Sequence, residues 1–115
     1  MSKIITLSNI NSMEFEDIVE FKKLKLKAKV SYYYLDFGRY HERGVERLNT
    51  AIIKKTGINL KTLIEDTVGY SFDGSFPEVR NIEDLRKIVK RLLELLGKKV
   101  KIITFEKYKK SKEYV

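Results

Sequence analysis

The sequence contains no cysteine, tryptophan or glutamine, and its 115 residues include one histidine and one proline. The absence of cysteine excludes a disulfide scaffold, a thiolate metal site and a cysteine nucleophile. A glycine-rich phosphate loop and a Gly-x-Ser-x-Gly elbow are also missing, which excludes the enzyme classes built on those motifs. We therefore expect a non-enzymatic protein without a metal ion or other cofactor.

Long apolar runs are missing as well. No stretch approaches the roughly 20 apolar residues of a membrane-spanning helix, and residues 1–7 lack the apolar region of a signal peptide. We expect a cytoplasmic protein with no membrane partner. The 43% hydrophobic content is sufficient for one ordinary core. A single α+β domain over residues 1–105 and a basic, frayed tail over residues 106–115 are predicted.

The clearest periodic signal is an alternation of apolar residues and lysines that begins at Lys23. Leu24, Leu26, Ala28 and Val30 alternate with lysines, and aromatic residues continue the pattern to Tyr34. Because successive side chains of a strand point to opposite faces, this pattern predicts one long β-strand over about residues 23–35. That strand would have an apolar face and a lysine face.

The other predicted elements surround this strand. Short strands at 3–7 and 99–105 complete a small sheet, and helices at about 42–56 and 82–96 pack on its apolar face. Asn59 caps a shorter helix after the first of these. The dipeptide Asp73-Gly74 predicts a tight hairpin.

Residues 13–23 have two interpretations. A helix is favoured because Asn11 or Ser12 provides an N-cap, acidic residues occupy the first turn and lysines the last. As a strand, the same stretch would place its glutamates, Glu14, Glu16 and Glu20, opposite the lysine face as cross-strand pairs. The second interpretation would explain the lysines without any ligand.

Basic residues outnumber acidic ones, with a net charge of +8 and a pI of about 9.6. This excess favours a polyanionic partner, and we predict phosphate-directed binding of DNA, RNA or a nucleoprotein. Tyrosines beside the lysines would supply base stacking. The candidate residues are Lys23, Lys25, Lys27, Lys29, Tyr33, Arg39, Tyr40, Arg43, Lys54, Lys55 and Lys61.

The lysine face also has simpler explanations, because it could be a solvated sheet face or a strand edge protected from self-pairing. The alternative function is a protein-binding inhibitor or adaptor of viral or mobile-element type, for example acting on a host nucleoprotein. Tyrosine is favoured at such interfaces, and the aromatic strand would add to a partner's sheet or to a second copy in a homodimer.

Three further motifs are weaker. Residues 52–64 resemble a helix-turn-helix in which Asn59, Lys61 and Thr62 would open the recognition helix, but acidic residues follow at once. Glu20-x-Lys22 matches an element of metal-dependent nucleases, but no acidic residue lies on an earlier strand. His41 has no partner for acid–base catalysis at a recognisable spacing.

Overall fold

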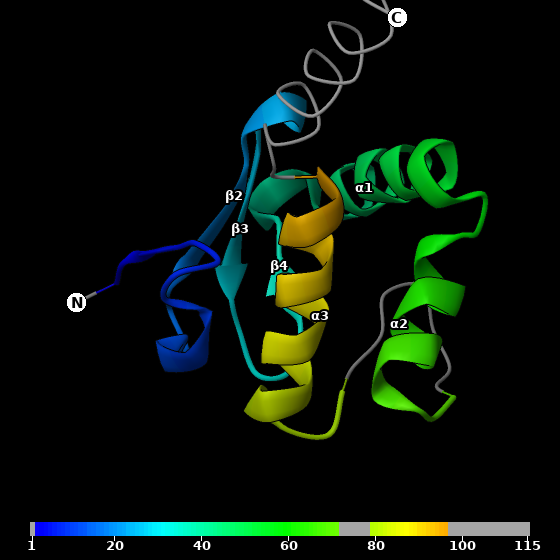
Figure 1. Ribbon diagram of the computed structural model, residues 1–115. Helices are drawn as coiled ribbons and strands as arrows, with labels where there is room; N and C mark the ends of the chain where they lie inside the picture. Colours follow the sequence, from blue (N-terminus) through cyan, green and yellow to red (C-terminus); the bar gives the residue numbers. More distant parts are fainter. Residues whose placement is uncertain (1, 72–78, 97–115) are drawn as a thin grey trace, which may run out of the picture.

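Alternating burial in two neighbouring strands builds the centre of the fold. The computed structural model describes residues 2–71 and 79–96 (Figure 1). Strand β2 (Ile18–Phe21) pairs antiparallel with β3 (Leu26–Val30), so that Val19 faces Ala28 and Phe21 faces Leu26. These four side chains are buried, because they line the face that the helices cover. The intervening positions of β3 are exposed lysines.

Two short strands complete the sheet, whose order is β1-β2-β3-β4. Strand β1 (Ile4–Ile5) runs parallel to β2, and β4 (Leu35–Asp36) runs antiparallel to β3. Side chains and loops occupy both outer edges. The Asn9 carboxamide donates to the Ile4 carbonyl and accepts from the Thr6 amide, as a neighbouring strand would.

On either side of β4, main-chain groups of the flanking residues Tyr33 and Phe37 are occupied. The Val79 amide donates to the Tyr33 carbonyl, and His41 Nδ1 accepts from the Phe37 amide at 3.1 Å. Occupied edge groups oppose strand addition by another chain.

Three helices form the other layer. Helix α1 (His41–Thr56) ends at Gly57, whose φ of 80° gives a left-handed C-cap. Helix α2 (Leu60–Val68) begins at Asn59, whose side chain accepts from the Thr62 amide. Helix α3 (Ile82–Leu96) packs on the sheet, and α1 and α2 pack against α3 and each other (Figure 1). The buried stripe of α3 is Leu85, Ile88, Val89, Leu92, Leu93 and Leu96.

The predicted α+β class and the helices at 42–56 and 82–96 are therefore confirmed. The sheet is also built around the predicted stretch, but the long strand over residues 23–35 is shorter than predicted. A 3-10 turn, η2 (Lys22–Leu24), precedes it, and Lys25 is left-handed with a φ of 50°. After Val30 the chain reverses, because the Ser31 amide bonds to the Tyr34 carbonyl and Tyr33 is left-handed.

The preferred helix over residues 13–23 is wrong, and the strand alternative is correct for residues 18–21. The reason is a bulge at the start of β2. The Glu16 amide donates to the Val30 carbonyl, and the Val30 amide donates to the Asp17 carbonyl. Glu16 and Asp17 thus lie opposite the single residue Val30, and Glu16 is in the left-handed region with a φ of 76°.

Three predictions lie outside the described residues. They are the Asp73-Gly74 hairpin, the strand at 99–105 and the tail at 106–115.

Candidate functional site

A group of exposed basic side chains gathers where η2 meets α1. The Arg47 guanidinium donates to the Leu24 carbonyl and so connects the two segments. Arg43, Arg47 and Lys54 share one flank of α1, since they are four and seven residues apart. A shallow hollow between the two segments is lined by Leu24, Glu46, Arg47 and Lys54 among others. We call the following six residues the basic patch: Lys22, Lys23, Lys25, Arg43, Arg47 and Lys54.

The charges of the basic patch are not neutralised within the described part of the chain. All six residues are exposed. Over residues 2–71 and 79–96, none of the six lies within 4.0 Å of a carboxylate. Ammonium and guanidinium groups held close together without acidic partners raise the local positive potential, which favours a polyanion.

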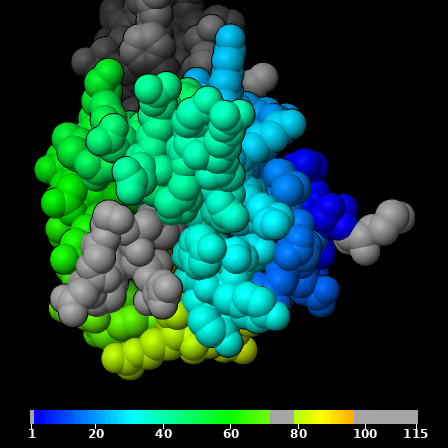
Figure 2. All heavy atoms as spheres, turned by 180° about the vertical axis from the view of Figure 1, so that it is seen from behind, coloured from blue at the N-terminus to red at the C-terminus, as the bar shows by residue number. Residues whose placement is uncertain are grey.

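An exposed tyrosine stands at the N-terminal end of the same helix. The Tyr40 side chain is 62% exposed, and the guanidinium carbons of Arg39 and Arg43 lie 5.6 and 5.7 Å from its ring centroid. We call these three residues the Tyr-Arg corner. They also line an open hollow with Glu42 and Glu46. Figure 2 shows the start of α1 (teal and green) spread over the centre of this face, beside residues of the twenties and thirties (light blue and cyan).

Short-range hydrogen bonds fix the Tyr-Arg corner. Arg39 and Tyr40 belong to the 3-10 turn η3 (Gly38–Tyr40), in which Gly38 has a φ of 82° and donates its amide to Asp36 Oδ1 at 2.8 Å. The Phe37 amide donates a hydrogen bond to Nδ1 of the His41 imidazole. His41 is therefore a structural element of the corner.

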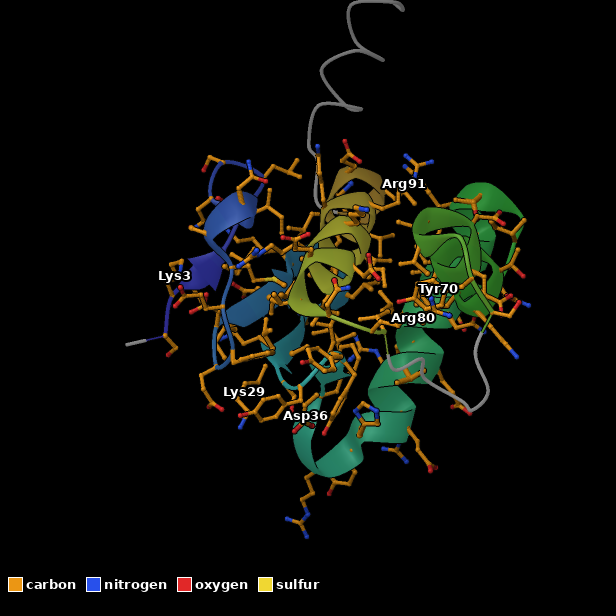
Figure 3. The ribbon with its side chains drawn as sticks, turned by 90° about the horizontal axis from the view of Figure 1, so that it is seen from below. Lys3, Lys29, Asp36, Tyr70, Arg80 and Arg91 are labelled. Atoms are coloured by element: carbon orange, nitrogen blue, oxygen red, sulfur yellow. The ribbon has the colours of Figure 1, made fainter. Side chains whose placement is uncertain are left out.

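The lysines of β3 lie on a different surface. Lys27 and Lys29 point away from the helices, on the open face of the sheet. Each has an acidic neighbour, because Lys27 faces Glu20 in the strand register and Lys29 faces Asp36. Lys29 also lies 3.6 Å from a Glu16 carboxylate oxygen. Figure 3 shows Lys29 and Asp36 close together, consistent with partly compensated charge on this face.

The structure thus divides the predicted site residues. It groups Arg39, Tyr40 and Arg43 at the start of α1, and it places Lys23 and Lys25 on either side of Leu24, which contacts Arg47 on the flank of α1 that also carries Lys54. It leaves apart Lys27, Lys29, Tyr33, Lys55 and Lys61. Lys61 lies in the first turn of α2 and lines a groove between α1 and α2 together with Glu42 and Glu46.

Sequence reasoning missed two members of the basic patch, Lys22 and Arg47. Arg47 could have been found from the helical spacing, since it lies four residues after Arg43 and seven before Lys54 on the same predicted helix. Its contact with Leu24 could not have been predicted in this way.

A second exposed feature consists of three aromatic rings on two adjoining turns. We call Phe15, Tyr32 and Tyr33 the aromatic turn cluster. Their ring centroids are 4.7 to 6.2 Å apart, and Tyr32 is 71% exposed. Each turn contains a non-glycine residue in the left-handed region, Glu16 in one and Tyr33 in the other. Such backbone strain concentrates at functional positions.

Asp17, the one buried charged residue within 2–71 and 79–96, supports the fold rather than a reaction. Its carboxylate accepts from the Lys3 ammonium at 3.0 Å and from the amides of Lys3 and Glu14. Burial alone would raise the pKa of Asp17, but these hydrogen bonds outweigh it and hold the pKa below its usual value. Asp17 therefore joins the β1 segment to the bulge of β2.

Tyr70 is likewise structural. Its hydroxyl donates to Asp84 Oδ2 and accepts from the Arg80 amide, and the Arg80 guanidinium covers its ring at 3.9 Å. Figure 3 shows Tyr70 and Arg80 side by side. Burial, followed by the neighbouring Asp84 carboxylate, raises the pKa of Tyr70 above its ordinary value. A nucleophilic tyrosine would need the opposite shift.

The structure adds no support for the helix-turn-helix or the Glu20-x-Lys22 nuclease motif. Asn59 and Thr62 form the N-cap of α2, and the buried side of that helix, Leu60, Leu63 and Ile64, packs in the core. Glu20 faces Lys27 across the sheet. Among residues 2–71 and 79–96, no group of three or more His, Asp or Glu side chains is placed to hold a metal ion.

Comparison with protein-family models, with curated proteins and with solved structures finds no match. None of the helices in the described ranges is long and apolar enough to cross a membrane.

Proposed function

We propose that this protein is a small, non-enzymatic nucleic-acid-binding protein that holds phosphates with the basic patch. The observation that carries the proposal is the convergence of six exposed cations from η2 and α1 without acidic partners among the described residues. Cations arranged in this way release counterions when they neutralise phosphates, which gives affinity without sequence recognition. The Tyr-Arg corner extends the surface with a partly exposed ring.

The basic patch is a better candidate than the lysine face of β3. A phosphate approaching Lys27 or Lys29 would also meet Glu20, Glu16 or Asp36, and repulsion from these carboxylates offsets the attraction. Within 4.0 Å in the described chain, Lys29 has a carboxylate oxygen of Glu16, whereas the lysines of η2 have no carboxylate; Glu20 lines a hollow with Lys22 and Lys23 but forms no ion pair with them. A cytoplasmic location, where nucleic acid is accessible, agrees with the absence of cysteine.

The test is a salt titration of the full chain against a fluorescein-labelled oligonucleotide of mixed sequence. If all six cations of the patch engage phosphates, log K falls with log salt at a slope of about −5, so affinity decreases about 10³-fold between 50 and 200 mM salt. The absence of binding at 50 mM salt would overturn the proposal.

A second candidate function is protein binding through the aromatic turn cluster, as in an inhibitor or adaptor of viral or mobile-element type. The observation that favours it is three exposed rings held on strained turns, since Tyr and Phe are enriched at interfaces. Strand addition is disfavoured, because side chains occupy main-chain groups at the edge of β1 and directly after β4. A homodimer of this kind would dissociate in the Tyr32→Ser variant, as measured by light scattering.

A further inference from the structure

We infer that the Tyr40 ring is a stacking platform for an unpaired nucleobase and that the ligand of this surface is single-stranded nucleic acid. The inference rests on the proposed function and narrows it to one class of polyanion. It depends on the exposure of the ring, on the rigidity of its support and on its position at one end of the basic patch.

The ring is open to a ligand although two guanidinium groups lie close to it. Arg39 and Arg43 are 5.6 and 5.7 Å from the ring centroid, and the side chain remains 62% exposed. Tyr70 provides the contrast, because Arg80 lies 3.9 Å from its centroid and Tyr70 is half-buried. Arg39 and Arg43 are thus placed to bind the phosphates beside a stacked base.

The support of the ring is fixed before any ligand arrives. Gly38 is held by Asp36 Oδ1, and the Phe37 amide is held by His41 Nδ1. Phe37 also packs closely against Gly44 of α1, where a Cβ would lie 2.6 Å from Phe37 Cγ. A preorganised ring loses little conformational entropy on stacking, so more of the interaction appears as affinity.

The Tyr40 ring lies at one end of a row of basic residues along α1. With a rise of 1.5 Å per residue, Arg43, Arg47 and Lys54 follow Tyr40 at about 4, 10 and 21 Å along α1. A strand whose base stacks on Tyr40 therefore meets successive cations along one flank of the helix. Binding sites for single strands combine such a basic track with aromatic rings and cover about 4–16 nucleotides.

Duplex nucleic acid would leave the ring unused. In a duplex the faces of the bases are covered by their neighbours, whereas a single strand can turn a base out to stack on an aromatic side chain. Phosphate contacts alone do not distinguish the two forms in this way. The exposed ring thus predicts a preference for the single strand.

The test compares a labelled 12-nucleotide single-stranded DNA of mixed sequence with the same strand annealed to its complement, and an RNA of the same sequence. The wild-type chain is expected to bind the single strands more tightly. Tyr40→Ala should weaken single-strand binding about 5- to 160-fold, the range measured for loss of one stacking ring, and change duplex binding less than about 2-fold. Tyr40→Phe should retain the preference.

Tyr32→Ala is the matched control, because it removes an even more exposed tyrosine outside the basic patch and should change neither affinity. The chain has no tryptophan, so Tyr40→Trp introduces a unique fluorophore. Its emission should be quenched by the 12-nucleotide strand, whereas that of Tyr32→Trp should not.

Different results would contradict the stacking inference and the proposed function. Wild-type binding to both forms with equal affinity, unchanged by Tyr40→Ala, would overturn the stacking inference and leave phosphate-directed binding intact. Binding to neither form at 50 mM salt would overturn the proposed function and the inference with it.

Discussion

The Arg47 guanidinium donates a hydrogen bond to the main-chain carbonyl of Leu24, joining segments that are 23 residues apart. Arg47 thereby holds η2 against α1, and the lysines of η2 come to lie beside the basic flank of the helix. One arginine thus helps to assemble the patch and is also part of it. The side chain can do both because a guanidinium has five N–H donors, so protons remain for a ligand.

Asp17 should make the stability of the fold depend on acidity. Its folded-state pKa lies below the unfolded value of about 3.9, so its contribution is complete above that value and is lost as the pH falls through the lowered pKa. The free energy of unfolding, measured in urea from pH 7 to pH 3, should therefore decrease below about pH 4.

The Asp17→Asn variant should lose about 2 kcal/mol at pH 7, because it leaves partly buried hydrogen-bond donors of Lys3 and Glu14 poorly satisfied. As the pH falls from 7 to 3, the free energy of unfolding of this variant should also decrease less than that of the wild type. Asp66→Asn, at an exposed position of α2, is the control and should behave as wild type. Identical pH curves for Asp17→Asn and wild type would contradict this assignment.

Gly44 should be intolerant of a side chain. A Cβ at this position would lie 2.6 Å from Phe37 Cγ and 2.7 Å from Phe37 Cβ, so Phe37 would have to move. Gly44→Ala should destabilise the protein by about 1–3 kcal/mol, although alanine is the better helix former. It should also weaken single-strand binding, since Phe37 supports the Tyr-Arg corner.

The matched control for Gly44→Ala is Thr50→Ala on the exposed side of the same helix. Thermal unfolding followed by circular dichroism should show a lower midpoint for the first variant only. A stabilised Gly44→Ala protein would show that the contact with Phe37 is not tight.

Glu46 should weaken the binding of polyanions. Its side chain lines the hollow that also contains Arg39, Tyr40 and Arg43, so a bound phosphate would meet its negative charge. Glu46→Gln should raise affinity at 50 mM salt about 2-fold, and the gain should shrink as salt is added. Glu14→Gln, beside the aromatic turn cluster, should have no effect. A loss of affinity in Glu46→Gln would count against the proposed path of the ligand.

Much of the helical layer could be predicted from the sequence, because the signals are local. Asn59 and Gly57 mark helix ends by their own side chain or backbone preference, and the apolar spacing of α3 needs no tertiary information. The predicted strand over residues 23–35 is longer than the observed β3 because the end of β3 has no local sequence signal. The chain reverses at Tyr33, an aromatic residue in a left-handed conformation that glycine or asparagine usually adopts.

The candidate site could be predicted only in part for a related reason. Charge content identified a basic region, but strand periodicity assigned Lys23 and Lys25 to the same face as Lys27 and Lys29. The turn at η2 separates the two pairs, and the left-handed Lys25 has no sequence signal. Compensation of Lys29 by Glu16 depends on the bulge in β2, which residue spacing alone does not reveal.

The most direct test of the central claim compares two double variants that remove the same charge. Lys23→Ser with Lys25→Ser alters the basic patch, and Lys27→Ser with Lys29→Ser alters the open face of the sheet. In a salt titration against the labelled single strand, the first should bind at least about 10-fold more weakly at 100 mM salt, with a slope shallower by about 1.4. The second should remain within about 3-fold of wild type, because acidic neighbours already offset its lysines. Equal losses in both variants, or a larger loss in the second, would contradict the account.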